Sequence, residues 1–411
     1  MIHDGAFGKS LALLRTRRFG TFWFASLLSN IGTWAQQVAQ PWLLLSLGAS
    51  PFLLGLDAFA MGAPIFLLTL IGGAMADLID RRRVIVFFQS IQMLCPMLLV
   101  VLIMTDHIQP WMVIVLSLVV GVTDALSMPS FQSIVPSIVQ REQIPAGIAL
   151  NSTQFNLSRI LGPSLAGLLI VGVGMAGAFA LNAASYLPFI LVSLWVLPRS
   201  EPTQHDEEFT RHRFWAGIRD SVREPALRGA LLTVFATSVL CAPLITFCPV
   251  LVKEVFAGSI EHFSLTMSAF GVGGLLGAVG LLAVGPARDR RPISSWLAVA
   301  YAITVVLAAQ NHWPWGLPVL FVVAGVTMTA SNASANTLLQ SIAPVRLRGQ
   351  TISLFMLAIR GGVSLGSLLT GLTVNVLGVR EALFINGVLA VLAHLAIGYE
   401  WRRSPLPRSV V

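Results

Sequence analysis

Residues 51–104 read PFLLGLDAFAMGAPIFLLTLIGGAMADLIDRRRVIVFFQSIQMLCPMLLVVLIM, which is two long apolar runs separated by a short charged turn. Each run is continuous rather than alternating. At 1.5 Å of rise per residue, each is long enough to cross roughly 30 Å of hydrocarbon as a helix. Asp80 and the arginines at 81–83 stand in the turn. We interpret this stretch as two transmembrane helices joined on one side of a membrane.

The rest of the chain repeats this pattern. Hydrophobic residues make up 55% of the 411 residues and charged residues only 11%, whereas about a quarter of a soluble protein is charged. A soluble fold could not hide so much apolar surface. The long runs predict an all-α membrane protein with twelve transmembrane helices rather than a barrel. The predicted spans are residues 20–46, 51–73, 84–104, 110–136, 146–172, 176–197, 229–256, 263–285, 293–310, 316–340, 348–376 and 380–400.

The positive charges lie on one side of this predicted bundle. A formal charge of +8 is compatible with nucleic-acid binding, but 22 of the 26 Lys and Arg residues fall in the N-terminus, the C-terminus or the loops after even-numbered helices. Only Lys253 and Arg380 lie on the opposite side, and Arg159 and Arg360 fall inside spans. By the positive-inside rule, both termini are expected in the cytoplasm, in a bacterial inner membrane. No nucleic-acid partner is expected.

Several other classes of protein are disfavoured. Cys95, Cys241 and Cys248 all fall inside predicted spans, which suggests neither disulfides nor a metal cluster. The sequence GKS at 8–10 resembles the end of a phosphate-binding loop, but His3 stands where its first glycine belongs and no strand precedes it. We therefore expect no ATP hydrolysis, no cofactor, no metal and no enzymatic activity.

The two halves of the chain resemble each other. QSIVP at 132–136 matches QSIAP at 340–344, LGPSLAGLL at 161–169 matches LGSLLTGLT at 365–373, Asn182 matches Asn386, and the DRR at 80–82 matches that at 289–291. We predict two pseudo-symmetric six-helix bundles, residues 1–197 and 229–411, joined by a cytoplasmic loop at 198–228. Parallel repeats of this kind place a substrate path between them near the middle of the membrane.

The segment GGAMADLIDRRRVIV at 72–86 resembles motif A of the major facilitator superfamily, G-x-L-A-D-R-x-G-R-R-x-x-L. Leu78 and Asp80 depart from that motif, where it has arginine and glycine. The resemblance implies a cytoplasmic gate that latches the halves together; the alternative is an ordinary turn with positive-inside anchors. The residues assigned to the gate motif are Gly73, Asp77, Asp80, Arg81 and Arg82.

The segment SRILGPSLAG at 158–167 resembles the motif associated with antiporters of the superfamily, G-x-x-x-G-P-x-x-G-G. Gly162, Pro163 and Gly167 match it, and Ser158 and Ala166 replace glycines. The alternative is close packing of helices through small residues. The longer stretch at 124–169, with GTWAQQVAQPWLLL at 32–45, resembles the branch that holds enterobactin-type siderophore exporters and macrolide efflux proteins.

Polar side chains recur on single faces of four predicted helices, as a transport cavity requires. The alternative is hydrogen bonding between helices. The candidate cavity residues are Asn30, Thr33, Gln37, Gln40, Ser127, Asn151, Gln154, Ser158, Asn332, Asn336 and Arg360.

Charges inside spans are costly and therefore candidates for function. These are Asp57, Asp124, Arg159 and Arg360. Asp124 and Arg159 lie at comparable depths on consecutive helices, so we hypothesise that Asp124 exchanges its proton for a pairing with Arg159. A static ion pair is the alternative. Arg159 and Arg360, on equivalent helices of the halves, would suit an anionic or catecholate-like substrate.

These patterns predict a secondary transporter, working as a monomer in the bilayer, that exports small amphipathic compounds such as a siderophore, secondary metabolite or antibiotic. Proton antiport is the expected energy source. Two alternatives stay open: an importer or symporter of the same fold, and a transport-inactive membrane sensor or scaffold.

Overall fold

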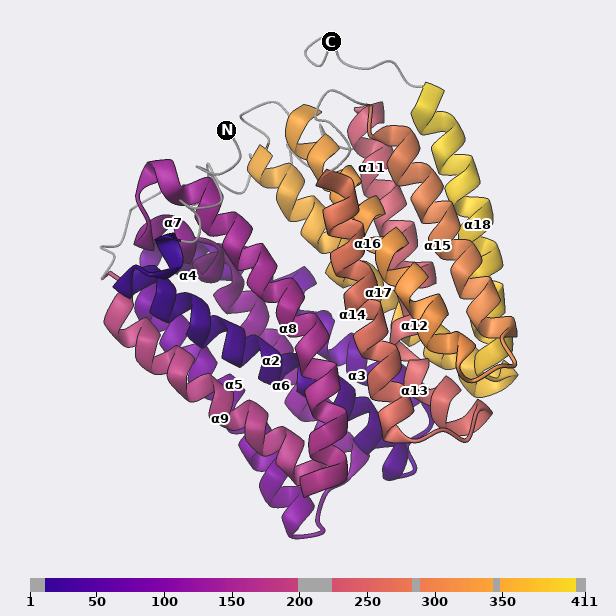
Figure 1. The fold of residues 1–411 in the computed structure, drawn as a ribbon, viewed down its shortest axis with the longest axis horizontal. Helices are drawn as coiled ribbons and strands as arrows, with labels where there is room; N and C mark the ends of the chain where they lie inside the picture. The colour runs from indigo at the N-terminus through magenta and orange to yellow at the C-terminus, as the bar shows by residue number, and fades with distance from the viewer. Residues whose placement is uncertain (1–11, 199–223, 283–288, 343–347, 404–411) are drawn as a thin grey trace. The chain divides into compact units, whose positions relative to one another are not determined.

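The computed structural model describes residues 12–198, 224–282, 289–342 and 348–403, and these segments are helical with no strand among them (Figure 1). The chain divides into two compact units. The first combines Met1–Leu43 with Leu67–His205, and the second combines Leu44–Phe66 with Asp206–Val411. The all-α fold predicted from the apolar runs is confirmed.

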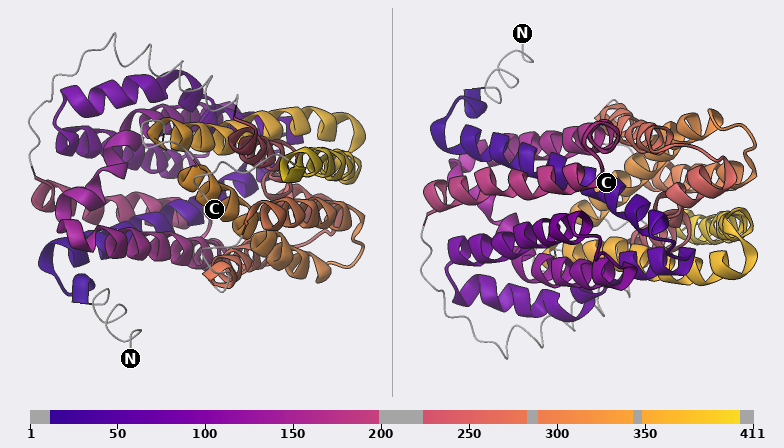
Figure 2. Two further views of the ribbon diagram at one scale, coloured as in Figure 1. Left: turned by 90° about the horizontal axis from the view of Figure 1, so that it is seen from above. Right: turned by 90° about the horizontal axis from the view of Figure 1, so that it is seen from below.

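The first unit is a bundle of long helices with short connections (Figure 2). Within it, α5 packs against α6 and α9, and α8 packs against α9. Two of its helices, α2 and α4, cross the boundary between the units. The helices are α2 (Arg17–Ser46), α4 (Pro64–Leu78), α5 (Arg81–Met104), α6 (Pro110–Gln132), α7 (Ile134–Ile138), α8 (Ile144–Val173) and α9 (Met175–Val196).

The second unit has the same all-helical construction. Here α14 packs against α16, α15 packs against α16 and α18, and α17 packs against α3. The helices are α3 (Pro51–Gly62), α11 (Pro225–Ala236), α12 (Pro243–Thr246), α13 (Cys248–Val250), α14 (Ile260–Leu282), α15 (Arg291–Gln310), α16 (Gly316–Ile342), α17 (Arg348–Leu377) and α18 (Val379–Arg403).

Eleven helices in the described part of the chain are long and apolar enough to cross a membrane. The remaining predicted span corresponds to α2, which is 30 residues long. Its length suffices, but Asn30, Gln36, Gln37 and Gln40 interrupt the apolar run. These amides explain why α2 falls below the hydropathy of the other spans.

Two predicted spans are interrupted at prolines. The span at 51–73 consists of α3 and α4, which meet at Ala63 just before Pro64. The span at 229–256 contains π-helical turns at Thr237–Cys241 and Leu251–Val255 around the short helices α12 and α13, which begin at Pro243 and Cys248. A proline inside a helix removes one backbone donor and clashes with the preceding turn, so regular α-helical bonding does not continue through these points.

Small residues allow α3 and α17 to approach closely. A Cβ added at Gly55 would lie 2.4 Å from the carbonyl oxygen of Ser367, and one added at Gly371 would lie 3.3 Å from the Cα of Gly55. Packing through glycine is typical of membrane helices, because the attraction between them depends on close van der Waals contact.

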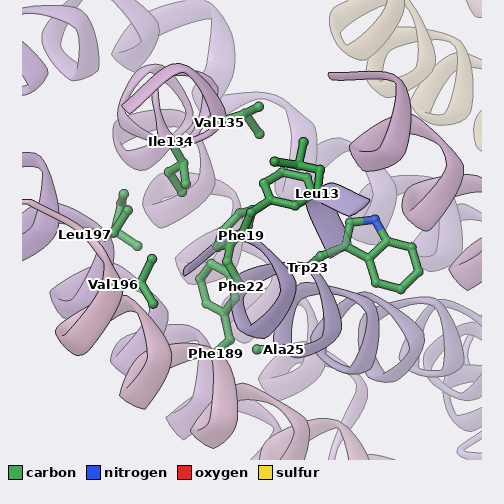
Figure 3. Close-up of a cluster of buried hydrophobic side chains, with 11 residues drawn as sticks. Leu13, Phe19, Phe22, Trp23, Ala25, Ile134, Val135, Phe189, Val196 and Leu197 are labelled. Atoms are coloured by element: carbon green, nitrogen blue, oxygen red, sulfur yellow. The ribbon is translucent and has the colours of Figure 1, made fainter. Parts of the chain in front are cut away.

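A cluster of buried apolar side chains closes one end of the first unit (Figure 3). Phe22 and Phe131 both pack against the ring of Phe189, the latter pair stacked with centroids 5.7 Å apart. Ile134 and Leu197 belong to the same cluster. A second cluster, around Leu227, Leu339, Phe355 and Trp401, fills the corresponding interior of the other unit.

Candidate functional site

A chain of hydrogen bonds joins three helices inside the first unit. On α2, Gln40 donates from Nε2 to Ser117 Oγ of α6 at 2.7 Å, and Gln36 donates to Gln40 Oε1 at 3.0 Å. Asn182 of α9 donates to Gln36 Oε1 at 2.5 Å. Gln40, Ser117 and Asn182 are all buried. We call the four side chains Ser117, Gln40, Gln36 and Asn182 the amide chain.

Tyr186 connects the amide chain to the carboxylate of Asp124. The tyrosine is one turn beyond Asn182 on α9 and is only 6% exposed. Its hydroxyl interacts with the side chains of Thr33 and Asn182, and the ring lies close enough to Asp124 of α6 to sense its charge. The half-buried carboxylate of Asp124 therefore has the hydroxyl-bearing side chain of Tyr186 among its neighbours.

A second polar contact joins α5 and α6. Gln89 donates to Gln92 Oε1 at 2.7 Å, and Gln92 donates to Thr123 Oγ1 at 3.0 Å. Thr123 precedes Asp124 directly, and Ser127 donates to the Thr123 carbonyl oxygen at 2.7 Å. The side chains of Gln89, Gln92, Thr123 and Ser127 are all buried. The bonds from Gln92 and Ser127 to Thr123 therefore hold the turn of α6 that carries Asp124.

On α8, the predicted cavity residues have different environments. Gln154 is 1% exposed, and its Nε2 meets no hydrogen-bond partner among the described residues. Ser158 is buried and donates to the Gln154 carbonyl oxygen at 2.7 Å. Asn151 and Arg159 are half-buried. The pairing of Arg159 with Asp124 stays a prediction.

The antiporter-like segment packs against α2. A Cβ added at Gly162 would lie 2.4 Å from the Cβ of Trp34, and Pro163 and Gly167 are buried beside it. Trp34 in turn makes an edge contact with Phe155. Small-residue packing is thus visible here, and the link to antiport stays a prediction.

The second unit has its own set of polar residues. On α16, Gln340 donates to Asn336 Oδ1 at 3.1 Å, and Asn332 Oδ1 is buried without a partner in the described residues. Arg360 of α17 is exposed, whereas Asp57 of α3 is 6% exposed. On the other face of α16, Ser331 and Ser294 bond to each other's carbonyl oxygens, which fixes α16 against α15.

A buried histidine contacts the first π-helical turn of this unit. His394 of α18 is 2% exposed and lies with Nε2 3.2 Å from Thr237 Oγ1. Tyr301 of α15 donates to the carbonyl oxygen of Cys241 at 3.2 Å, at the other end of the same turn. These contacts hold the π turn from two sides.

The two charged turns predicted as repeats have the same local geometry. Asp80 Oδ1 accepts from the backbone N–H of Arg82 at 3.1 Å, and Asp289 Oδ1 accepts from that of Arg291 at 3.0 Å. Arg291 also pairs with Asp289 through its guanidinium at 3.0 Å. Partial burial opposes the charged form of Asp289, but these bonds and the arginine charge lower its pKa below the usual value.

The structure describes only some of the side chains assigned to the gate motif. Arg81 and Arg82 begin α5 and are half-buried. Gly73 and Asp77 lie on α4, but their side-chain positions fall outside what the structure describes. No group of three potential ligands suited to a metal ion occurs among the described residues.

Sequence reasoning missed two central members of the first unit's polar interior, Gln36 and Tyr186. Thr33 and Gln40 lie on one face of α2, and positions 36 and 37 flank that face on either side. The prediction chose Gln37, which is exposed, whereas Gln36 bonds to both neighbours. The sequence signal for Gln36 was its spacing of three and four from Thr33 and Gln40.

A family model for transmembrane secretion effectors matches residues 8–408, nearly the whole chain. The chain belongs to this family of major facilitator superfamily transporters. It is 25% identical over 378 residues to the staphyloferrin A transporter of Staphylococcus aureus, with 90% of this chain and 93% of the relative covered.

Two further relatives are named for efflux or export. The multidrug efflux pump Tap of Mycolicibacterium fortuitum is 26% identical, with 90% of this chain and 93% of Tap covered. The enterobactin exporter EntS of Escherichia coli is 24% identical, with 96% of each chain covered. Among solved structures, the nucleoside transporter NupG shares the fold with a TM-score of 0.78 at 13% identity, covering 94% of this chain and all of NupG.

Proposed function

We propose that this transporter exports small amphipathic compounds, such as a siderophore, a secondary metabolite or an antibiotic, by proton antiport and alternating access. The observation that carries the proposal is the buried polar interior of the first unit. Its amide chain reaches Tyr186 and Asp124 at the depth of the membrane spans. A carboxylate in such a place is expensive to bury and is a candidate proton carrier.

In the proposed cycle, Asp124 takes up a proton at one stage and is charged at another, when Arg159 stabilises it. Tyr186 lies near the carboxylate, and the bond from Ser127 to the Thr123 carbonyl oxygen belongs to the helical turn that carries Asp124. A hydroxyl group such as that of Tyr186 can either donate or accept a hydrogen bond.

The second unit supplies the proposed preference for anionic compounds. Arg360 is exposed and lies on the helix that packs against α3. A guanidinium of this kind is suited to carboxylate or catecholate groups. The siderophore and drug exporters among the relatives support export of such compounds.

The proposed location is the bacterial inner membrane with both termini in the cytoplasm, since the positive charges lie on that side. The protein is proposed to act as a monomer. The predicted domain boundaries, residues 1–197, 198–228 and 229–411, belong to the same proposal. The segment 199–223 lies outside the described residues.

The function is tested by measuring accumulation of candidate siderophores and antibiotics in cells that carry or lack the transporter, with and without an uncoupler. Export predicts higher accumulation in the deletion strain, and an uncoupler is expected to abolish the difference. Lower accumulation on deletion would instead identify an importer. Unchanged accumulation of every compound, with transport also absent in vesicles, would indicate a sensor or scaffold.

A further inference from the structure

The span that begins with α11 contains a turn whose backbone bonds can be exchanged without loss. In the π turn at Thr237–Cys241, the Ala242 N–H donates to the carbonyl oxygen of Thr237 at 3.1 Å. An α-helical turn would direct the same N–H to the carbonyl oxygen of Ser238. Pro243 has no N–H to donate in either arrangement. The two arrangements use the same backbone donors, so contacts from neighbouring helices can decide between them.

Two helices hold the π arrangement on one side, and both pack against this turn (Figure 1). His394 of α18 is 2% exposed, with Nε2 3.2 Å from Thr237 Oγ1, and Tyr301 of α15 donates to the Cys241 carbonyl oxygen at 3.2 Å. His394 Nδ1 is buried and has no hydrogen-bond partner among the described residues. An apolar side chain would fill this space without leaving a nitrogen unbonded. The contact with Thr237 is therefore what histidine adds at this position.

On its other side, the turn lies against a groove of glycines on α17. A Cβ added at Gly362 would lie 2.6 Å from Ser238 Cβ, and one added at Gly366 would lie 2.7 Å from Val239 Cα. Gly362 and Gly366 are four residues apart and share a face of α17. The backbone of the turn can therefore move along α17 without meeting a side chain from either position.

A hydrogen bond further along the chain depends on the register of the turn. The hydroxyl oxygens of Thr246 on α12 and Ser367 on α17 are 3.0 Å apart, and Ser367 is fully buried. Conversion of the π turn to an α-helical turn would rotate the residues that follow by about 100°. That rotation would carry Thr246 away from Ser367, so their bond accompanies the π arrangement.

We propose that the π turn is a two-position register switch. His394 holds the turn in its π position, and conversion to α-helical bonding rotates residues 242–256 during the transport cycle. This use in transport rests on the alternating access proposed above. The π turn within a longer helix is a frequent feature of functional sites. Because packed interfaces have discrete arrangements, the exchange of backbone bonds gives two positions rather than a continuous bend.

Hydrogen exchange of the Ala242 amide, followed by mass spectrometry of the detergent-purified protein, tests the switch without any substrate. Conversion must break the bond from Ala242 to Thr237, so the exchange rate reports how often it occurs. H394L removes the side-chain bond to Thr237 and should speed exchange about fivefold, the effect of one lost hydrogen bond. H394Q keeps a hydrogen-bonding group there and should exchange nearly like the wild type. N386L is the matched control, because it removes a buried bond of α18, to Thr370 at 2.7 Å, away from the turn.

A disulfide that fixes the present register separates rotation from local unfolding. T246C/S367C, made in a background whose three native cysteines are alanine, places two thiols where the hydroxyl groups now meet. Its oxidation should abolish the faster exchange that H394L produces. The control pair is S294C/S331C, whose native hydroxyl oxygens are 3.4 Å apart between α15 and α16. Oxidation of that pair should leave the faster exchange unchanged.

Two results would overturn the proposal. The first is exchange of Ala242 that H394L leaves unchanged, or that N386L raises equally. The second is fast exchange that survives oxidation of T246C/S367C, because local unfolding would then explain it.

The same disulfide tests the use of the switch in transport. Oxidised T246C/S367C should stop export of the compound identified by the accumulation assay, and a reductant should restore it, whereas oxidised S294C/S331C should export normally. Full export by oxidised T246C/S367C would exclude the rotation from the transport cycle. If the accumulation assay identifies no compound, the proposed function fails, while the exchange measurement still decides whether the switch exists.

Discussion

The side-chain amide of Asn182 on α9 donates a 2.5 Å hydrogen bond to Gln36 on α2. The two residues are 146 positions apart in the chain, and the bond belongs to the amide chain that continues to Gln40 and Ser117. In a membrane interior, water is not available to replace such a bond when one partner is removed. The amide chain therefore fixes α2 relative to α9 and α6 at the depth where Asp124 lies.

Replacing Asn182 by leucine should leave Gln36 Oε1 without its donor. We expect N182L to lower the free energy of unfolding by about 1–3 kcal/mol, the cost of a buried unsatisfied polar group. Q36L should act similarly, and the double variant should lose less than the sum because the pair is lost only once. Thermal unfolding in detergent measures this, with Q37L at the exposed neighbour as control. Additive losses in the double variant would show that the two side chains are not coupled.

Replacing Asp124 by asparagine should uncouple export from the proton gradient. Loss of one coupled charge removes about 2.3 kcal/mol of driving force per 100 mV, which is roughly a fiftyfold lower accumulation ratio. Proteoliposomes with an imposed pH gradient and membrane potential provide the measurement. D106N makes the same chemical change at an exposed residue and should transport normally. Full proton-driven transport by D124N would eliminate Asp124 as the carrier.

Tyr186→Phe removes the hydroxyl that interacts with Thr33 and Asn182 while keeping the ring. We expect Y186F to fold and to shift the pH dependence of export, because the carboxylate of Asp124 would lose a fixed polar neighbour. Export rates measured between about pH 5.5 and pH 8.5 test this. A pH profile identical to that of the wild type would place Tyr186 outside the coupling machinery.

Enlarging Gly162 should disrupt the contact between α8 and α2. A Cβ there would lie 2.4 Å from the Cβ of Trp34 and 2.9 Å from the carbonyl oxygen of Ile31. We expect G162A to destabilise the protein by about 1–3 kcal/mol, as overpacking does. G172A, on the same helix with no atom within 4 Å of the added Cβ, is the matched control and should be neutral or slightly stabilising. Equal melting temperatures for the two variants would contradict the close approach.

The Asp289–Arg291 pair predicts a pH dependence of stability. Because the folded-state pKa of Asp289 is lowered, its contribution is present above the unfolded value of about 3.9 and is lost as pH falls through the folded value. The wild type should therefore melt higher than D289N near pH 6, and the gap should close as the pH falls below about 4. Since the carboxylate is about one-third exposed, added salt should also narrow the gap. A gap that stays constant across this range would show that the carboxylate charge is not involved.

The sequence predicted most of the fold because long apolar runs can only be helices in lipid. It placed the breaks less well: Pro64 divides one predicted span, and the π turns near Pro243 and Pro249 divide another. Such breaks depend on which backbone groups find hydrogen-bond partners outside their own helix. The Cys241 carbonyl oxygen, for example, accepts a bond from the Tyr301 hydroxyl. Spacing alone does not contain that information.

Within the candidate site, single-helix patterns were informative only about the helix on which they lie. The stripe on α2 included Gln40, which bonds to Ser117. The choice between Gln36 and Gln37 depends on the position of Asn182 on another helix. Tyr186 was missed because a lone aromatic residue in an apolar run resembles any other core residue. Its proximity to Asp124 arises only from the packing of α9 in the bundle.

The π turn at Thr237–Cys241 has a consequence for comparing sequences. The turn is closed by a hydrogen bond from the Ala242 N–H to the carbonyl oxygen of Thr237, five positions earlier. In an α-helix this bond reaches back four positions, so the π turn contains one additional residue. Each residue of helix corresponds to about 100° of rotation, so every side chain after this point faces a different neighbour than a gap-free alignment with a regular helix would assign. Homology inferences about residues 242–256 therefore require a one-residue gap at this turn when the relative lacks it.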